Sequence, residues 1–372
     1  MQMSYQLNRG VFDINISKSA MDPTLAFDIA ERINPKRSFL FVSKILGRHV
    51  PTTPCLMNAS YDSLAKLIPP DLPRPIVMIG MAETAVGLGA GVHRSYCNLN
   101  HDVQTNDEGP LYISTTRHRI NRPIFLEFLE KHSHATRHLI YEPDDAIKIK
   151  SLREAKSIIL IDDEATTGQT FINLYNALKN AGLNKIERLI TCVLTDWSDQ
   201  AIKQSIPLCT DQISLISGDY SYTPYNLPIL QKEHEGEPSE PDPLQSSGNS
   251  RLGVWHNSTS LQKAPTVKEN ERIAVIGTGE FVWSPFLLAE HLEKQGATVT
   301  FSATSRSPIN IGKAIKSKIT FKDNYGFGIN NFLYNVDPDN FDRIILCCET
   351  SRERLDPHLV STLNAEVISY EK

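Results

Sequence analysis

The sequence predicts an α/β fold in two parts: an N-terminal domain with a mostly parallel sheet, and a smaller α/β C-terminal domain. Continuous apolar segments alternate with amphipathic stretches, which is typical of buried parallel strands connected by helices. The 372 residues exceed one average domain. A polar segment rich in Glu, Pro, Ser and Gly, residues 231–250, cannot offset its ordering entropy by burial. We therefore expect domains at residues 1–230 and 251–372, joined by a linker or exposed loop at 231–250.

In the N-terminal part, four apolar segments are the expected strands: residues 76–80, 111–114, 157–161 and 188–194. Between the last two, Phe171, Leu174 and Leu178 fall on one helical stripe, and the helix is expected to end at Gly182. Residues 157–194 therefore form a strand–helix–strand unit.

The C-terminal part follows the same pattern. Strands are expected at residues 272–276, 298–303 and 342–347, with an amphipathic helix at 284–294 closed by Gly296. The first turn has Gly277 and Gly279, but Val282 stands where a dinucleotide fingerprint has its third glycine. A nicotinamide cofactor is therefore not expected.

Composition narrows the classes of partner. The net charge of −5 offers no general attraction to nucleic acid or anionic lipid. No apolar run reaches the ~18 residues of a membrane span, and the first residues lack a secretory pattern. We expect a soluble, cytoplasmic protein with small-molecule partners, and the sequence is compatible with a homodimer.

The segment that carries chemistry is IILIDDEATTGQT, residues 158–170. A buried strand ends in Asp162 and Asp163, at the edge where open α/β sheets bind ligands. The turn at residues 166–170 would direct backbone N–H groups at a phosphate from the start of a helix. Helix capping by Thr166 or Thr167 is the alternative explanation. Capping leaves two successive acids unexplained, because such a charge pair is unfavourable without hydroxyl or cation partners.

This segment resembles the phosphoribosyl pyrophosphate (PRPP) signature of the type I phosphoribosyltransferases. The resemblance implies a Rossmann-like parallel sheet in the N-terminal domain, with Asp162 and Asp163 on the ribose hydroxyls and the following loop around the 5′-phosphate. It implies Mg²⁺ as cofactor, held mainly by PRPP and also by Asp162 and Asp163. The PRPP-binding candidates are Asp162, Asp163, Glu164, Ala165, Thr166, Thr167, Gly168, Gln169 and Thr170.

Two upstream segments occupy the positions of the pyrophosphate loop and the catalytic flap of such enzymes. The loop candidates are Met81, Ala82, Glu83 and Thr84. In the basic stretch 114–137, Arg117 and Arg119 are the candidates for neutralising the leaving group, against the alternative of a solvated basic loop. His132, His134 and His138 lack the Cys or second ligand cluster of a zinc site. Lys44, Arg48 and His49 could reach the acceptor or pyrophosphate, but we favour an exposed helix face for them.

In the C-terminal domain, Arg306 stands among hydroxyls after a strand, and Ser284 begins a helix. Ser284, Ser305, Arg306 and Ser307 are candidates for binding a phosphate or carboxylate group, against a turn held by local hydrogen bonds.

Taken together, GMAETAVGLG, EKHSHATRH and IDDEATTGQT look like the phosphoribosyltransferases found with tellurite-resistance (Ter) gene clusters. The C-terminal GTGEFVWSPFLLAEHLE and DNYGFGINNFLYNV are similar to the TRSP domain that follows them, with Ser305 in place of its threonine. The resemblance implies synthesis of a nucleoside-like metabolite in a stress response. Thr166 stands where purine-salvage enzymes carry an Asp, which leaves an orotate-like or unusual acceptor open.

The sequence thus predicts a phosphoribosyltransferase that uses PRPP and Mg²⁺ with a base-like acceptor, in the forward or the reverse direction. A non-catalytic sensor of PRPP or nucleotides is the alternative.

Overall fold

The computed structural model describes residues 1–32, 38–100, 109–129, 137–206, 208–226, 241–244, 250–257 and 264–371. Most of the predicted linker at 231–250 lies outside these ranges, as do Lys131, His132 and His134. Among the helices described, none is long and apolar enough to cross a membrane.

The N-terminal part is built on a seven-stranded sheet in the order β1-β2-β11-β10-β9-β5-β6. The five strands from β11 to β6 run parallel, and β1 and β2 extend the sheet antiparallel. The predicted α/β class with a parallel-rich sheet is therefore confirmed. The strands are β1 (Gln2–Leu7), β2 (Gly10–Ser19), β5 (Ile76–Gly80), β6 (Leu111–Ser114), β9 (Ser157–Ala165), β10 (Arg188–Asp196) and β11 (Cys209–Pro224).

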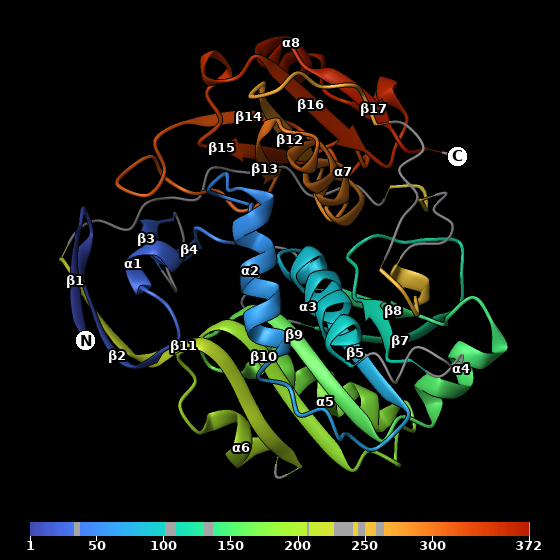
Figure 1. The fold of residues 1–372 in the computed structure, drawn as a ribbon. Helices are drawn as coiled ribbons and strands as arrows, with labels where there is room; N and C mark the ends of the chain where they lie inside the picture. The colour runs from blue at the N-terminus through green and yellow to red at the C-terminus, as the bar shows by residue number, and fades with distance from the viewer. Residues whose placement is uncertain are drawn as a thin grey trace.

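Helices cover both faces of this sheet. Helices α2 (Pro54–Ala65) and α3 (Ala85–Leu99) pack side by side in front of it, and α5 (Gln169–Asn180) lies behind it (Figure 1). The two short hairpins are β3 (Phe27–Glu31) with β4 (Phe39–Ser43), and β7 (Ile124–Leu129) with β8 (Arg137–Tyr141). The remaining helices are α1 (Pro23–Ala26), α4 (Ala146–Arg153) and α6 (Ala201–Ser205).

The C-terminal part has a fully parallel four-stranded sheet in the order β13-β12-β16-β17 and a separate hairpin of β14 and β15. Its strands are β12 (Arg272–Gly277), β13 (Thr298–Ala303), β14 (Lys318–Lys322), β15 (Asn330–Tyr334), β16 (Arg343–Cys348) and β17 (Glu366–Ser369). Its helices are α7 (Trp283–Lys294) and α8 (Pro357–Leu363), with single 3-10 turns at Ser250–Leu252, Pro338–Asn340 and Arg352–Arg354.

The two sheets share one hydrophobic core. Met57 and Tyr61 of α2 belong to the same buried cluster as Phe286 of α7 and Phe301 of β13, and the Tyr61 and Phe286 rings lie 5.6 Å apart. Thr52 and Phe301 exchange two backbone hydrogen bonds of 3.0 and 2.7 Å. The C-terminal part thus sits directly on α2 and α3 rather than on a tether (Figure 1).

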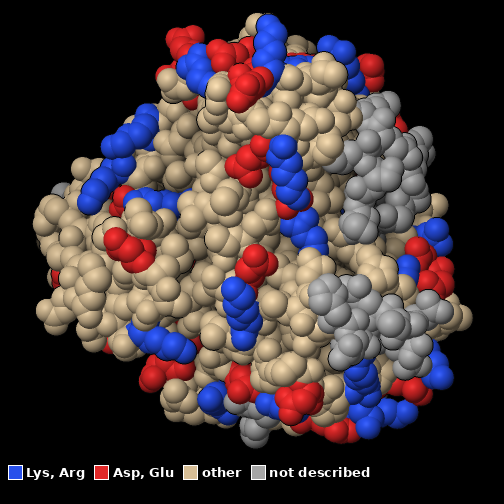
Figure 2. Space-filling view, viewed as in Figure 1, with Lys and Arg blue, Asp and Glu red and all other residues tan. Residues whose placement is uncertain are grey.

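The surface in the same view carries both signs of charge. Lys and Arg side chains alternate with Asp and Glu over the described part of this face, without an extended patch of one sign (Figure 2).

Candidate functional site

The paired acids lie at an open edge of the main sheet. Strand β9 continues to Ala165, four residues beyond the predicted end, because its pairing with β10 extends to Ala165 and Asp196. Its pairing with β5 on the other side stops at Ile161 and Gly80. Half-buried Asp162 and Asp163 therefore sit where β5 has turned away, as expected for a ligand-binding edge.

The following turn requires glycine at one position. Gly168 precedes α5 with φ 70°, and a Cβ there would lie 2.2 Å from Cγ1 of Ile202. The Thr167 hydroxyl accepts a hydrogen bond from the Gln169 N–H at 3.4 Å. The turn therefore brings the backbone tightly against α6 and presents the N-terminus of α5 beside the acids.

The predicted pyrophosphate loop, Met81 to Thr84, connects β5 to α3 next to these acids. Met81 N–H donates to the Ile161 carbonyl at 3.0 Å, and the Thr84 hydroxyl donates to Oδ1 of Asp163 at 2.9 Å. The peptide bond between Ala82 and Glu83 is cis. The structure thus brings together two of the predicted segments.

Thr115, which the sequence did not single out, and His138 support this loop. The Thr115 hydroxyl accepts from the Ala82 N–H at 2.8 Å and lies 3.1 Å from Nδ1 of His138. His138, predicted in a basic flap, is 1% exposed and stacks on Phe128 with ring centroids 4.6 Å apart. The available signal for Thr115 was its position directly after the strand predicted at residues 111–114.

The two candidate arginines differ in position. Nη2 of Arg117 lies 3.4 Å from the Ala82 carbonyl, beside the pyrophosphate loop. Arg119 is exposed, and its carbonyl accepts from the Leu244 N–H at 2.8 Å. The Arg117 side chain is therefore next to the loop.

Our preference for an exposed helix face at residues 44–49 is wrong for Arg48 and His49, which are 2% and 7% exposed. The Arg48 guanidinium pairs with the Glu83 carboxylate at 2.9 Å and donates to the carbonyls of Glu83, Thr304 and Gly279. Because the last two carbonyls belong to the C-terminal part, Arg48 ties the pyrophosphate loop to it.

A second buried connection joins Glu280 to the start of the predicted flap. Its carboxylate accepts from the Thr116 hydroxyl and, at 2.8 Å, from the Arg117 N–H. Arg251 lies 3.3 Å from Glu280 and pairs with both oxygens of Glu349 at 2.7 and 2.8 Å. Burial alone would raise the pKa of Glu280, but the neighbouring Arg251 guanidinium and the hydrogen bonds from Thr116 and Arg117 hold it below its ordinary value. Nothing in the sequence indicated this network, because its Arg and Glu residues are isolated and lie far apart along the chain.

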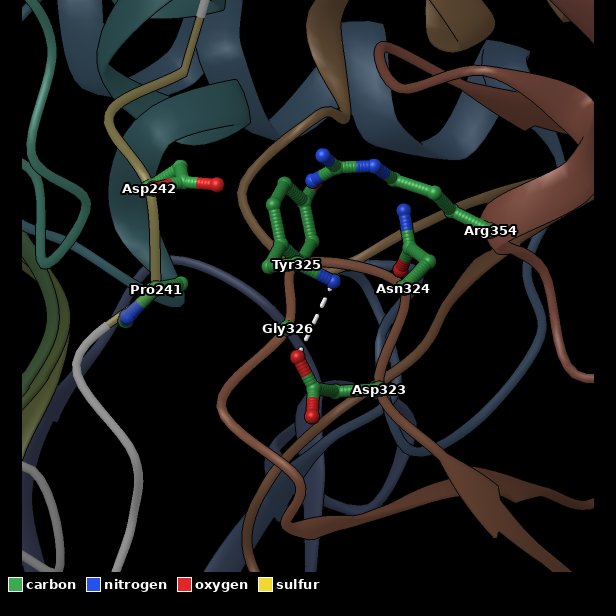
Figure 3. A pocket seen from close by; sticks show the side chains of 7 residues that line it. All are labelled: Pro241, Asp242, Asp323, Asn324, Tyr325, Gly326 and Arg354. Carbon is green, nitrogen blue, oxygen red and sulfur yellow. Dashed lines mark hydrogen bonds between the residues drawn. The ribbon is translucent and has the colours of Figure 1, made fainter.

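His118 contacts the C-terminal part next to a polar cavity. Its ring stacks on Tyr325 with centroids 4.1 Å apart, and burial lowers its pKa to about 3. Asp242 and Arg354 point toward each other across the cavity (Figure 3). The cavity of about 380 Å³ is lined by Pro241, Asp242, Asp323, Asn324, Tyr325, Gly326 and Arg354.

The C-terminal ligand candidates do not form one cluster. Ser305 is buried, and its hydroxyl accepts from the Ser307 N–H at 3.2 Å, as in a local turn. Ser284 lies in the first turn of α7, and no hydrogen bond joins it to these residues in the described structure. The Arg306 N–H instead faces Oε1 of Glu83 at 3.4 Å.

Within the described ranges, no three His, Cys, Asp or Glu side chains converge as a metal site.

The family profile described as phosphoribosyl transferase matches residues 26–219, and the profile of the TRSP domain that is C-terminal to it matches residues 250–363. No curated protein matches the chain. Adenine phosphoribosyltransferase from Giardia lamblia is similar in structure at 17% identity and TM-score 0.34, over 54% of this chain and 98% of that one. Orotate phosphoribosyltransferase from Francisella tularensis is similar at 16% identity and TM-score 0.30, over 52% and 80%.

Proposed function

The chain belongs to the phosphoribosyl transferase family, a family of pentosyl-transferring enzymes, and on that premise we propose that it transfers 5-phosphoribose from PRPP to a base-like acceptor. Pyrophosphate leaves as the bond from the anomeric carbon to the acceptor forms. The same groups would serve the reverse reaction.

The hydrogen bond between Thr84 and Asp163 is the observation that carries this proposal. It joins the loop proposed for pyrophosphate to the acids proposed for ribose, so that both ends of the bond to be broken would be held by one rigid edge. Asp162 and Asp163 would accept from the ribose hydroxyls. The N-terminus of α5, with Thr166 to Thr170, would bind the 5′-phosphate.

Cationic residues that follow β6 would balance the negative charge of the departing pyrophosphate. Arg117 lies against the Ala82 carbonyl, where its guanidinium can meet pyrophosphate oxygens. Arg119 is exposed. Since guanidinium groups stabilise charge that develops on a departing phosphate, we propose Arg117 as the main contact.

Magnesium fits this arrangement as a companion of the substrate. Mg²⁺ prefers oxygen ligands and usually takes one or two carboxylates along with substrate phosphates. Asp162 and Asp163 would supply the carboxylates. The ion would neutralise charge on the pyrophosphate, while the protein's own groups orient the ribose.

The acceptor and the biological setting are the finer part of the proposal. Thr166 cannot act as a base at neutral pH, which favours an orotate-like or unusual acceptor over simple purine salvage. We further propose a cytoplasmic enzyme of nucleoside-like metabolite synthesis, associated with tellurite or other stress resistance. Residues 1–230 and 251–372 would be its two domains.

The ribose assignment is tested by the double variant Asp162→Asn with Asp163→Asn. We expect the loss of two charged acceptors to weaken PRPP binding by roughly a hundredfold or more in titration calorimetry with Mg²⁺. Asp219→Asn is the matched control, because Asp219 lies on β11 of the same sheet and is exposed. Unchanged PRPP affinity in the double variant would show that the acids do not bind ribose.

Turnover is tested by pyrophosphate release from PRPP across a panel of nucleobases, with Arg117→Ala and Arg119→Ala in parallel. An enzyme releases pyrophosphate with at least one acceptor, and Arg117→Ala lowers kcat more than Arg119→Ala does. Tight binding of PRPP with no release in any arm favours the sensor instead.

A further inference from the structure

We propose that Arg306, from the C-terminal part, binds the pyrophosphate group of PRPP, so that the phosphoribosyl site is composite and incomplete without that part. The inference rests on the proposed function and adds to it a residue more than 130 positions away from the PRPP signature in sequence.

The loop carrying Arg306 is fixed against the pyrophosphate loop. Arg48, 2% exposed, binds the Thr304 carbonyl at 2.6 Å and the Glu83 carboxylate at 2.9 Å with the same nitrogen. The Arg306 N–H lies 3.4 Å from the same Glu83 oxygen. Because the connection through Arg48 is buried, the two loops are held as one unit.

The Arg306 side chain has no protein acceptor within the described residues. Its guanidinium lies over the Phe327 ring, 4.4 Å from the ring centre, and only its backbone N–H is hydrogen-bonded. The side chain is half-buried. A guanidinium has five N–H donors, and stacking on an aromatic face leaves its edge open to an oxyanion.

The charge balance around the pyrophosphate loop explains why Arg306 remains available. Glu83, the acid nearest to its backbone, is already paired with Arg48. Arg117 approaches the same loop at Ala82, one residue before Glu83. The Arg306 backbone and the Arg117 guanidinium thus contact adjacent residues of one loop, from the C-terminal and N-terminal parts respectively.

Pyrophosphate is the ligand that this pair suits best. It carries several negative charges and oxygens in planar pairs that match a guanidinium fork. The departing group gains charge in the transition state, where fixed cations are most effective. A carboxylate on the acceptor is the competing ligand of the same chemistry, and the experiment separates the two.

The test uses the full-length protein and three probes with Mg²⁺: PRPP, inorganic pyrophosphate, and ribose 5-phosphate, which lacks the pyrophosphate. In calorimetry, we expect Arg306→Gln to weaken PRPP and pyrophosphate binding by roughly ten- to a hundredfold. Affinity for ribose 5-phosphate should stay within about twofold of the wild type. Arg306→Lys should recover part of the loss.

Arg354→Gln is the matched control, because Arg354 is an arginine of the same part that lines the polar cavity. It should leave all three affinities unchanged. Equal PRPP binding by wild type and Arg306→Gln overturns the inference and leaves the proposed function intact. A parallel loss for ribose 5-phosphate overturns it too, since that pattern indicates a collapsed site. Unchanged affinity for both PRPP and pyrophosphate is also the result expected if Arg306 binds the acceptor, and a wild type that binds no PRPP removes both proposals.

Discussion

For three of the buried histidines that the structure describes, burial holds the pKa of the ring well below its ordinary value. His49, His93 and His118 are 7%, 0% and 2% exposed. Burial lowers their pKa values to about 3, about 4 and about 3, below the ordinary 6.5. Near neutral pH these three rings are therefore neutral and contribute packing and hydrogen bonds. Their titratable side chains alone would suggest acid–base catalysis, but their lowered pKa values do not fit that role.

These rings predict a loss of stability in mild acid. In the unfolded chain each histidine takes up a proton near pH 6.5, while in the folded chain it stays neutral down to its lowered pKa. Protonation therefore favours unfolding as the pH falls below about 6.5. Each ring should cost up to roughly 2–3 kcal/mol between pH 6.5 and 4.5.

His118→Phe isolates one of them, because Phe retains the stacking on Tyr325. Urea unfolding at pH 7.5, 6.5, 5.5 and 4.5 should show that the variant takes up about one proton fewer on unfolding near pH 5. His358→Phe, at an exposed position of α8, serves as the control for replacing a histidine by phenylalanine outside the core. If His118→Phe follows the wild-type slope, the ring is not neutral in the folded state.

At the scale of elements, the turn between β9 and α5 combines two demands on Gly168. Its φ of 70° disfavours any residue with a Cβ, and the space for a Cβ is filled by Ile202. Gly182, after the same helix, has φ 92° but nothing within 4 Å of a Cβ. Comparing substitutions at these two glycines therefore separates the effect of backbone strain from the effect of steric overlap.

Gly182→Ala should cost only the backbone term, about 1–2 kcal/mol, and leave PRPP binding unchanged. Gly168→Ala should cost more, because α5 must also move from Ile202, and it should weaken PRPP binding at least tenfold by displacing the phosphate-binding turn. Urea unfolding and calorimetry of both variants measure the two effects. Equal destabilisation with intact PRPP binding would show that the turn does not hold the phosphate.

Sequence patterns located the parallel strands β5, β6, β9 and β10 of the main sheet, but missed β11 and the outer strands. Residues 76–80 and 111–114 match β5 and β6, because strands buried on both faces are continuously apolar. Strands β1 and β2 alternate buried and exposed residues at the sheet's antiparallel edge, and they were not predicted. The end of β9 was placed at residue 161 because its last paired residues are acidic, a composition unusual in strands.

The candidate site was predictable where its residues are neighbours in sequence and not where they meet across the fold. Asp162 follows the apolar stretch of β9 and Thr84 lies in the turn after β5, so pattern and position identified their segments. Arg48 and Glu280 are single charged residues without a local motif. Their roles follow from the contact between the two parts, which depends on tertiary packing.

At the scale of the whole molecule, the ends of two sheets meet around buried charges. The turn after β12 contains Gly279, whose carbonyl binds Arg48, and Glu280, whose carboxylate binds Thr116 in the loop after β6. The turn after β13 contains Thr304, whose carbonyl also binds Arg48. Opposing sheet ends concentrate the ligand-binding edges of both parts in one place. The C-terminal part therefore acts on the proposed site through direct contact.

This arrangement predicts that Arg48 is the main polar link between the parts. Arg48→Ala would leave the Glu83 carboxylate and two buried carbonyls without their donor, at a cost of roughly 3–5 kcal/mol. Arg94 of α3 is the matched comparison: it also crosses to the C-terminal part, through Glu290 at 2.9 Å and the Trp283 ring at 5.0 Å, but is 21% exposed. Arg94→Ala should therefore destabilise less and leave turnover near wild type, whereas Arg48→Ala lowers both the thermal midpoint and pyrophosphate release. The reverse order of the two midpoints would place the main polar connection at α3 and α7 instead.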